Sequence, residues 1–182
     1  NYYQVLNAKD YGIPQNRERV FAVSVRTDIL FEYYMKFEEK NDITYVEPYF
    51  EFPPKQELKL KLKDMLEDEV DEKYYLTDSM INYLENGKYN SAKVSNKLKQ
   101  TDTGICPTLD TMQGGNRQPF VNFKTRIRKL TPKECWRLMG FDDEDYEKAS
   151  EVNSNTQLYK QAGNSIVVNV LEAILKNLLL TC

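Results

Sequence analysis

The chain has 182 residues, and its 25 Lys and Arg side chains against 28 Asp and Glu give a formal net charge of −3. It contains no His, which excludes Ser-His and Cys-His nucleophilic pairs, Cys₂His₂ zinc sites and imidazole proton shuttles. Its three cysteines, Cys106, Cys135 and Cys182, are too few and too far apart for a zinc cage or a disulfide framework. We therefore expect no metal site and reduced thiols in a cytosolic protein, and no run of about 18 apolar residues predicts a membrane span.

Charge is distributed unevenly along the chain. Residues 38–85 carry 6 basic and 14 acidic side chains, whereas residues 86–137 carry 11 basic and 3 acidic ones. Lys and Arg side chains bind polyanions by neutralising phosphates and releasing counterions. The basic segment therefore predicts a local polyanion-binding face, with an ordinary solvated charged face as the alternative.

The first predicted element is a strand. Residues 20–25, Val-Phe-Ala-Val-Ser-Val, form a short β-branched run that is typical of a strand buried in a sheet. A Gly/Pro turn precedes it and brings Arg17 and Arg19 to its start. The sequence allows a short helix over residues 28–40, and the prolines within residues 47–54 then favour an extended crossover, which we take as a domain boundary.

The middle of the chain has weaker signals. Leucines and a methionine within residues 60–72 predict a small helix with a solvated acidic face. Thr77-Asp78-Ser79 resembles a helix N-cap for residues 80–84, with Gly87 near the end of that helix. From there to residue 123 the composition predicts short strands and loops, where recognition residues tend to lie.

The C-terminal third is expected to be mostly helical. Thr131-Pro132-Lys133-Glu134 is a capping box with Pro at the first helical position, and the helix should continue to Met139 and end at Gly140. Residues 142–156 are acidic and polar, which favours a loop with a short helical turn. Apolar residues at helical spacing predict a final amphipathic helix over residues 166–180.

Three segments carry a family resemblance through their order. Residues 11–19, 128–141 and 161–166 resemble the eighth, ninth and tenth sequence motifs of DNA (cytosine-5) methyltransferases of the bacterial restriction-modification type. The likeness covers the whole chain and matches the C-terminal half of such an enzyme. It implies an α/β fold: the C-terminal part of a Rossmann-like methyltransferase sheet that binds S-adenosyl-L-methionine, plus a smaller mixed α/β target recognition domain.

The resemblance also implies a domain layout and a reaction. Residues 1–48 would end the catalytic domain, residues 49–150 would form the target recognition domain, and residues 151–182 would return to the catalytic domain. Family members flip a cytosine out of double-stranded DNA, here the DNA of a bacterial cytoplasm. A cysteine thiolate adds to C6 of that cytosine, C5 attacks the methyl group of S-adenosyl-L-methionine, and loss of the C5 proton releases the enzyme.

The eighth motif supplies the expected catalytic residues. By resemblance, Arg19 contacts O2 of the flipped cytosine, where negative charge accumulates during the attack. Arg17 and Gln15 match positions that support the active-site carboxylate and the backbone around it. The alternative for these three residues is an ordinary surface turn.

The tenth motif supplies the expected cofactor-binding residues. Gly163, Asn164 and Ser165 are expected to open the last helix, where main-chain amides and polar side chains meet an anionic group at the positive helix terminus. In the family these positions line the amino-acid end of the cofactor. The alternative is a plain helix cap.

Residues 106–117 match the recognition region. Thr108 and Leu109 resemble its typical Thr-Leu pair, with Thr108 near the phosphate that flanks the flipped base. The side chains suited to reading base edges, and the glycines that would let the backbone approach DNA, follow directly: Gln113, Gly114, Gly115, Asn116 and Arg117. Phosphate contacts and structural turns are the alternatives for each of them.

The ninth motif is expected to support the recognition domain. Arg128 and Arg137 either contact phosphate or brace the loops. The apolar residues of the motif are expected to form core: Leu130, Trp136, Leu138, Met139 and Phe141.

The nucleophile of the family lies in a Pro-Cys dipeptide, and this sequence has only the reverse order, Cys106-Pro107. The glycine-rich cofactor loop and the Glu-Asn-Val block are also missing, and we expect all three upstream of Asn1. The chain alone is therefore expected not to methylate DNA. It would be either a piece of a longer enzyme or one subunit of a split enzyme. A free-standing DNA-binding module and an inactive relic are the alternatives.

Overall fold

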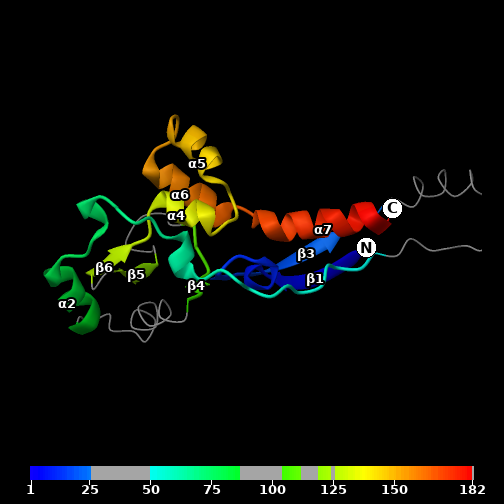
Figure 1. Ribbon diagram of the computed structural model, residues 1–182, viewed down its shortest axis with the longest axis horizontal. Helices are drawn as coiled ribbons and strands as arrows, with labels where there is room; N and C mark the ends of the chain where they lie inside the picture. The colour runs from blue at the N-terminus through cyan, green and yellow to red at the C-terminus, as the bar shows by residue number, and fades with distance from the viewer. Residues whose placement is uncertain (26–49, 87–103, 112–118, 124–125, 182) are drawn as a thin grey trace, which may run out of the picture.

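A computed structural model describes residues 1–25, 50–86, 104–111, 119–123 and 126–181 (Figure 1). The expected helix over residues 28–40 lies outside the described residues. The described strands pair into three two-stranded sheets, so the fold mixes small sheets with helices. In Figure 1 the first strands and the last helix lie together at one end of the long axis, where both described ends of the chain are found.

The N-terminal ribbon is built from β1 (Tyr2–Asn7) and β3 (Glu18–Val23), which pair antiparallel from Asn7↔Glu18 to Tyr2↔Val23. Between them lie the 3₁₀ helix η1 (Ala8–Tyr11) and the two-residue strand β2 (Gln15–Asn16). Asn7 begins η1 by accepting a hydrogen bond from the Lys9 N–H, and Gly12 ends it at φ 88°, a conformation that favours glycine.

The sequence predicts a buried strand over residues 20–25. The strand forms as part of β3, but the prediction that it is buried is wrong: Val20 is 71% exposed, while Phe21 and Val23 are half-buried. The reason is that a two-stranded ribbon has one covered face here, on which α7 (Val168–Thr181) lies (Figure 1). Alternate side chains of β3 therefore point away from the core.

The middle segment contains two 3₁₀ turns, η2 (Leu62–Met65) and η3 (Glu72–Tyr74), so the small helix expected over residues 60–72 is wrong. The Asp64 carboxylate accepts from the Lys61 N–H in a capping box at the start of η2, but Leu66 is already extended, so the turn ends after four residues. The next prediction is confirmed: α2 (Asp78–Asn86) begins after Thr77, whose hydroxyl oxygen accepts from the Met80 N–H.

Two short strand pairs complete the sheets. Strand β4 (Cys106–Pro107) pairs parallel with β2, and β5 (Phe120–Phe123) pairs antiparallel with β6 (Arg126–Lys129). These pairs bring segments far apart in the sequence together, since β2 and β4 are joined at Gln15↔Cys106 and Asn16↔Pro107. Short strands in this region are what the composition predicts.

The capping box is confirmed at the start of α4 (Pro132–Arg137). The Thr131 hydroxyl accepts from the Glu134 N–H at 3.2 Å, and the Glu134 carboxylate accepts from the Thr131 N–H at 2.8 Å. Gly140 follows the helix at φ 82°. The final helix is also confirmed, as α7.

Residues 142–156 are more helical than expected, because they contain α5 (Asp143–Ser150) and the start of α6 (Asn155–Asn164). The expectation of a loop with a short turn is therefore wrong. Three acidic residues lie in the first turn of α5, where they complement the positive end of the helix dipole, and Lys148 pairs with Glu144 one turn later.

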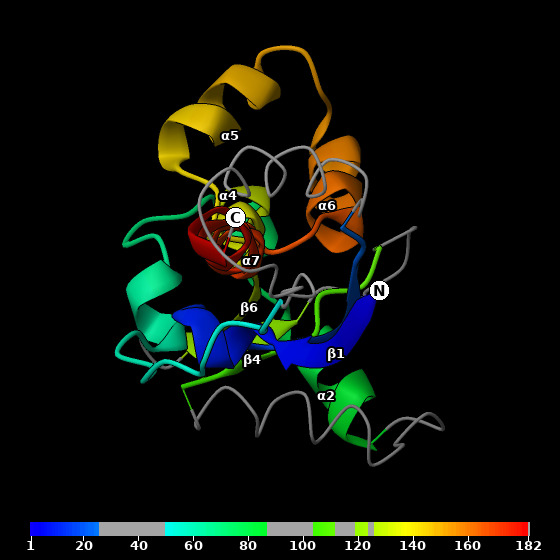
Figure 2. The same ribbon diagram turned by 90° about the vertical axis from the view of Figure 1, so that its right-hand side faces the viewer.

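The core lies where α4 packs against α6, with α5 beside them. Figure 2 shows α5 and α6 on the side of the molecule opposite to β1 and α2. The Trp136 indole N–H donates to the Leu158 carbonyl at 3.0 Å, and its ring lies 4.9 Å from that of Phe141. The core residues expected in the ninth motif are buried, apart from Phe141, which is half-buried: Leu130, Trp136, Leu138 and Met139.

Cys106 and Cys135 are buried free thiols, and Cys182 lies outside the described residues. Within the described ranges, no cluster of three or more acidic or thiol side chains is arranged to hold a metal ion. None of the helices described is both long and apolar enough to cross a bilayer.

Candidate functional site

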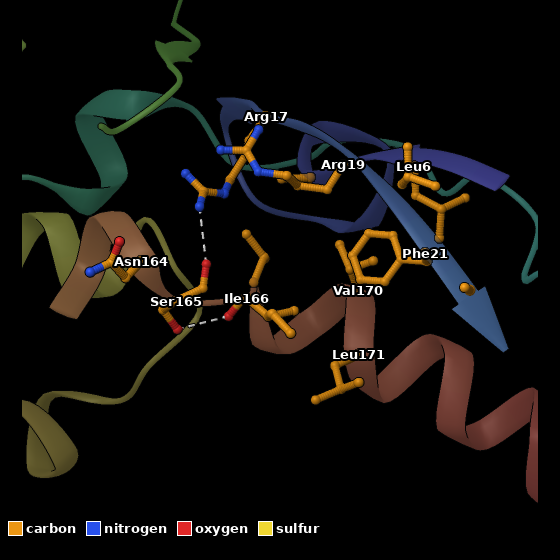
Figure 3. A pocket seen from close by; sticks show the side chains of 13 residues that line it. Leu6, Arg17, Arg19, Phe21, Asn164, Ser165, Ile166, Val170 and Leu171 are labelled. Carbon is orange, nitrogen blue, oxygen red and sulfur yellow. Dashed lines mark hydrogen bonds between the residues drawn. The ribbon is translucent and has the colours of Figure 1, made fainter. Parts of the chain in front are cut away.

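A cavity of about 500 Å³ lies between the ribbon and the start of α7 (Figure 3). Residues of the eighth motif, Arg17 and Arg19, line it together with Asn164 and Ser165 of the tenth motif. Figure 3 shows the two arginines near the end of the cavity that faces Ser165. The other end is apolar and is formed by residues that the sequence did not identify as part of a site: Leu6, Phe21 and Val170.

Arg17 is a buried cation held by main-chain carbonyls. Its side chain donates from Nη1 to the Leu109 carbonyl at 2.8 Å, and from Nη2 to the carbonyls of Gly163 at 2.9 Å and Ser165 at 3.0 Å. Arg17 is 5% exposed, and its Nε is buried with no hydrogen-bond partner among the described residues. Burial, with the neighbouring Arg19, lowers the pKa of Arg17 to about 10, so Arg17 keeps its charge at neutral pH.

Gln15 is fully buried and uses both ends of its amide. Its Nε2 donates to the Leu138 carbonyl at 2.7 Å, and its Oε1 accepts from the Leu109 N–H at 3.2 Å. Gln15 therefore joins the ninth-motif segment to the recognition segment. An ordinary surface turn, the alternative for these residues, does not describe Gln15 or Arg17.

Arg19 differs from both because it is exposed. Its Nη1 donates to the main-chain carbonyl of the adjacent Glu18 at 2.6 Å, and its side chain reaches the cavity. In the described part of the chain, Arg19 forms no ion pair with a carboxylate. Its guanidinium is therefore the cationic group of this cavity that is accessible to a ligand.

The expectation that Gly163, Asn164 and Ser165 open the last helix is wrong. Gly163 and Asn164 end α6, and Ser165 is its C-cap in an extended conformation, with its N–H donating to the Gln161 and Ala162 carbonyls. The last helix, α7, begins at Val168, whose N–H is bonded to the Met139 carbonyl at 2.9 Å. The Ser165 and Val168 amides are therefore occupied by protein partners.

These three residues have different environments. Asn164 is exposed at the edge of the cavity, and the Ser165 hydroxyl donates to the Ile166 carbonyl at 3.0 Å. Gly163 is buried against main chain: a Cβ on Gly163 would lie 2.7 Å from Thr111 Cα and would overlap the carbonyl group of Asp110. Of the three residues, Asn164 and Ser165 are the ones that line the cavity.

The recognition segment is anchored where the described residues reach it. Strand β4 pairs with β2, and the Thr108 hydroxyl donates to the Asn16 carbonyl at 2.6 Å. Thr108 is exposed, whereas Leu109 is fully buried. The five residues expected to meet DNA after this pair lie outside the described residues: Gln113, Gly114, Gly115, Asn116 and Arg117.

The two arginines of the ninth motif brace the structure. Arg128 forms a fully buried ion pair with Glu134, with Nη2 to Oε1 at 2.6 Å and Nη1 to Oε2 at 2.8 Å. Arg137 binds Asp143 through two nitrogens and donates to the Met65 carbonyl at 3.2 Å. Of the two alternatives, bracing is the one that these contacts support.

Comparison with known proteins identifies relatives along the whole chain. The family described as C-5 cytosine-specific DNA methylase matches residues 1–180. Type II methyltransferase M2.ScrFI of Lactococcus lactis subsp. cremoris is 40% identical over 187 residues, which covers 98% of this chain and 45% of that protein. Type II methyltransferase M.Bsp6I of Bacillus sp. is 38% identical over 188 residues, covering 97% of this chain and 54% of that protein. The chain spans about half the length of these relatives.

Solved structures support the same grouping at the level of the fold. The S. pombe Dnmt2 methyltransferase matches with a TM-score of 0.57 at 20% identity, covering 98% of this chain and 57% of that one. The Entamoeba histolytica methyltransferase EhMeth matches with a TM-score of 0.61 at 16% identity, covering 96% and 51%. The expected α/β class is confirmed. By its sequence match from residue 1 to residue 180, the chain belongs to the C-5 cytosine-specific DNA methylase family.

Proposed function

We propose that the chain is the C-terminal part of a DNA cytosine-5 methyltransferase, which transfers a methyl group from S-adenosyl-L-methionine to a flipped cytosine in double-stranded DNA. The observation that carries this proposal is the shared cavity. Arg19, expected to contact the base, and Asn164 and Ser165, expected to contact the cofactor, line one cavity although they are about 145 positions apart. A base and a methyl donor have to meet in one such place for methyl transfer to occur.

On the base side, the chemistry requires a fixed positive charge. Addition of a thiolate to C6 pushes electron density towards N3 and O2 of cytosine, and a guanidinium near O2 stabilises that charge. Arg19 suits this role because it is accessible to a ligand. Arg17 lies behind it as a buried anchor, so that the strand carrying Arg19 is held against the recognition segment and α6.

On the cofactor side, the cavity fits part of S-adenosyl-L-methionine. Its volume of about 500 Å³ lies within the range of roughly 300–1,000 Å³ that is typical of small-molecule sites. Apolar side chains line one end, and Asn164 and Ser165 supply polar groups at the other. When bound, this cofactor would supply the methyl group, and Asn164 and Ser165 would hold its amino-acid end.

The nucleophile is expected from a segment outside these 182 residues. Cys106 and Cys135 are both fully buried, and burial raises the pKa of each thiol above its usual range, which disfavours the reactive thiolate. The sequence has no Pro-Cys dipeptide. The cysteine that adds to C6 would therefore lie in the half of the enzyme that the relatives have and this chain does not span.

We also propose a division of labour along the chain. Residues 1–48 and 151–182 would belong to the catalytic domain, and residues 49–150 to the target recognition domain that contacts DNA. The contact of α7 with η1, and its place beside the β1–β3 ribbon in Figure 1, support the first pairing. The basic composition of residues 86–137 supports DNA contact by the second part, with Thr108, Leu109 and residues 113–117 at the interface.

The test is a chimera in which this chain replaces the segment of M2.ScrFI to which it aligns. With methyl-labelled S-adenosyl-L-methionine and unmethylated plasmid DNA, the chimera should produce 5-methylcytosine, whereas the 182-residue chain alone should produce none. Methylation by the chain alone would contradict the proposal that the nucleophile lies elsewhere. A folded chimera that binds DNA and the cofactor but forms no 5-methylcytosine would instead indicate a DNA-binding module.

A further inference from the structure

The main chain of Leu109 is held on both sides by Gln15 and Arg17, which lie two positions apart in one short segment. Its N–H donates to Gln15 Oε1 at 3.2 Å, and its carbonyl accepts from Arg17 Nη1 at 2.8 Å. Its side chain is fully buried in the core. Leu109 therefore has little freedom to shift while Gln15 and Arg17 stay in place.

The residues before Leu109 are fixed to the same segment. The Cys106 N–H donates to the Pro14 carbonyl at 2.7 Å, and the Thr108 hydroxyl donates to the Asn16 carbonyl at 2.6 Å. Residues 14–17 thus hold residues 106–109 through four successive positions. We call these contacts the Leu109 clamp.

A third segment closes the clamp at the point where the recognition segment leaves it. Arg17 donates to the Gly163 carbonyl at 2.9 Å, and the missing side chain of Gly163 lets the main chain of Asp110 and Thr111 lie directly on α6. The path of residues 108–111 is therefore set by β2 on one side and by α6 on the other.

The clamp is built on the segment that leads into the catalytic arginine. Arg19 follows Arg17 by two residues, in β3. Arg19 lies four positions after Gln15, which corresponds to at most about 14 Å of extended chain. A shift of Leu109 relative to Gln15 would therefore change where the recognition residues lie relative to Arg19.

We propose that Gln15 is a positioning residue for target recognition: by holding Leu109 it fixes the start of the recognition segment relative to Arg19, and the selectivity of methylation for its DNA site depends on this contact. The inference rests on the proposed function for its consequence in DNA methylation. Its structural part, the fixing of Leu109, does not depend on that function.

Gln15 is suited to this role because its amide group supplies a hydrogen-bond donor and an acceptor at once. The acceptor end holds Leu109, and the donor end is fixed by the Leu138 carbonyl and by Met139 Sδ, at 2.7 and 3.5 Å. Gln15→Met keeps the length of the side chain and removes both groups. The matched control is Gln157→Met on the exposed face of α6, and Leu158→Ala is a control that destabilises the core without touching the clamp.

The first measurement is amide hydrogen exchange in the 182-residue chain. Gln15→Met should accelerate exchange over residues 105–111 by about tenfold or more, because the Leu109 N–H loses its acceptor. Exchange over α5 should stay as in the unsubstituted chain, and Gln157→Met should change neither region. Unchanged exchange over residues 105–111, or the same acceleration over the whole chain, would overturn the proposal.

The second measurement maps methylation of plasmid DNA by bisulfite sequencing, using the chimera with M2.ScrFI. Gln15→Met should lower the ratio of methylation at the preferred sequence to methylation at related sequences by about tenfold, as expected when one directing contact is lost. Leu158→Ala should lower methylation at all sites in proportion.

The two measurements separate failure of this inference from failure of the proposed function. A proportional loss in Gln15→Met, like that in Leu158→Ala, would show a merely structural role and overturn the inference. An unsubstituted chimera that methylates nothing would contradict the proposed function instead. The exchange measurement would then still decide whether Gln15 fixes Leu109.

Discussion

Gly163 packs against the main chain of Asp110 so closely that no side chain fits between them. A Cβ on Gly163 would overlap the carbonyl group of Asp110 and would crowd Thr111 Cα. All of these are backbone atoms, so a change of side-chain rotamer cannot move them away. The glycine of the tenth motif is thus explained by packing between α6 and the recognition segment. A role in contacting the cofactor is not needed to account for it.

Gly163→Ala should therefore destabilise the fold by about 1–3 kcal/mol, because the added methyl group forces α6 away from residues 110–111. The sign of the change in the free energy of unfolding distinguishes close packing from open space at this position. Gly163 lies inside α6 and has no left-handed φ, so in open space alanine would stabilise the helix by up to about 1 kcal/mol. Urea unfolding of both proteins measures the difference, and a stabilised variant would contradict the close approach.

Two local signals in the C-terminal third predicted the local structure correctly. The Thr131 and Glu134 capping box and the apolar spacing of α7 depend on neighbours within a turn or two, and both helices are confirmed. The same reasoning placed Gly163 at the start of a helix, although it lies at the end of one. The extended Ser165 that separates α6 from α7 had no signal strong enough to show it.

The contacts that build the candidate site were beyond such reasoning because they are long-range. Gln15 meets Leu138 across 123 positions, and Arg17 meets Gly163 across 146. The family resemblance pointed to the correct motifs, while their partners depended on how three segments fold together. The exposure of Val20 was also missed, since a β-branched run cannot show that only one face of a ribbon is covered.

Removing one partner of the Arg128–Glu134 pair is expected to destabilise the fold strongly. The Glu134 carboxylate accepts from two Arg128 nitrogens and from the main-chain N–H groups of Thr131 and Glu67. Both side chains are fully buried, so Glu134→Ala would leave a buried cation without this carboxylate. The expected loss is about 3–5 kcal/mol in the free energy of unfolding, measured by urea denaturation.

The exposed pair between Glu144 and Lys148 on α5 provides the control for Glu134→Ala. Glu144→Ala should change the free energy of unfolding by about 0.5 kcal/mol or less, because a surface pair is screened by water. A loss in Glu134→Ala as small as that in Glu144→Ala would contradict the expected penalty for leaving Arg128 buried without this carboxylate.

Asp143 should make stability depend on pH in the acid range. Hydrogen bonds from Arg137 are the main cause that lowers the pKa of Asp143 from 3.8 to about 2, partial burial opposes them, and Lys133 adds to the lowering. Because the pKa is lower in the folded state, the stabilisation is present above pH 3.8 and is lost as the pH falls towards 2.

Asp143→Asn should remove this contribution. The side chain is 42% exposed, so after solvent screening the effect at neutral pH should be about 1 kcal/mol or less. Urea unfolding from neutral pH down to about pH 2 should show the two proteins converging as the medium becomes acidic. A difference that stays constant over this range would assign the effect to packing rather than to charge.

Arg19 should separate catalysis from stability. Its side chain is exposed and donates one hydrogen bond, to the carbonyl of its neighbour Glu18, so Arg19→Ala should leave the unfolding of the 182-residue chain within about 0.5 kcal/mol of the original. In the chimera with M2.ScrFI the same change should lower kcat for cytosine methylation by about 10²–10³, because the charge that develops at O2 loses its fixed cation.

Arg19→Lys should recover part of this loss of kcat, since lysine keeps the positive charge but lacks the planar guanidinium. Lys176→Ala, which removes an exposed cation on α7, is the control and should leave kcat unchanged. Unaltered kcat in Arg19→Ala would remove Arg19 from the reaction, and an equally large loss in Lys176→Ala would indicate a general effect of charge on DNA binding.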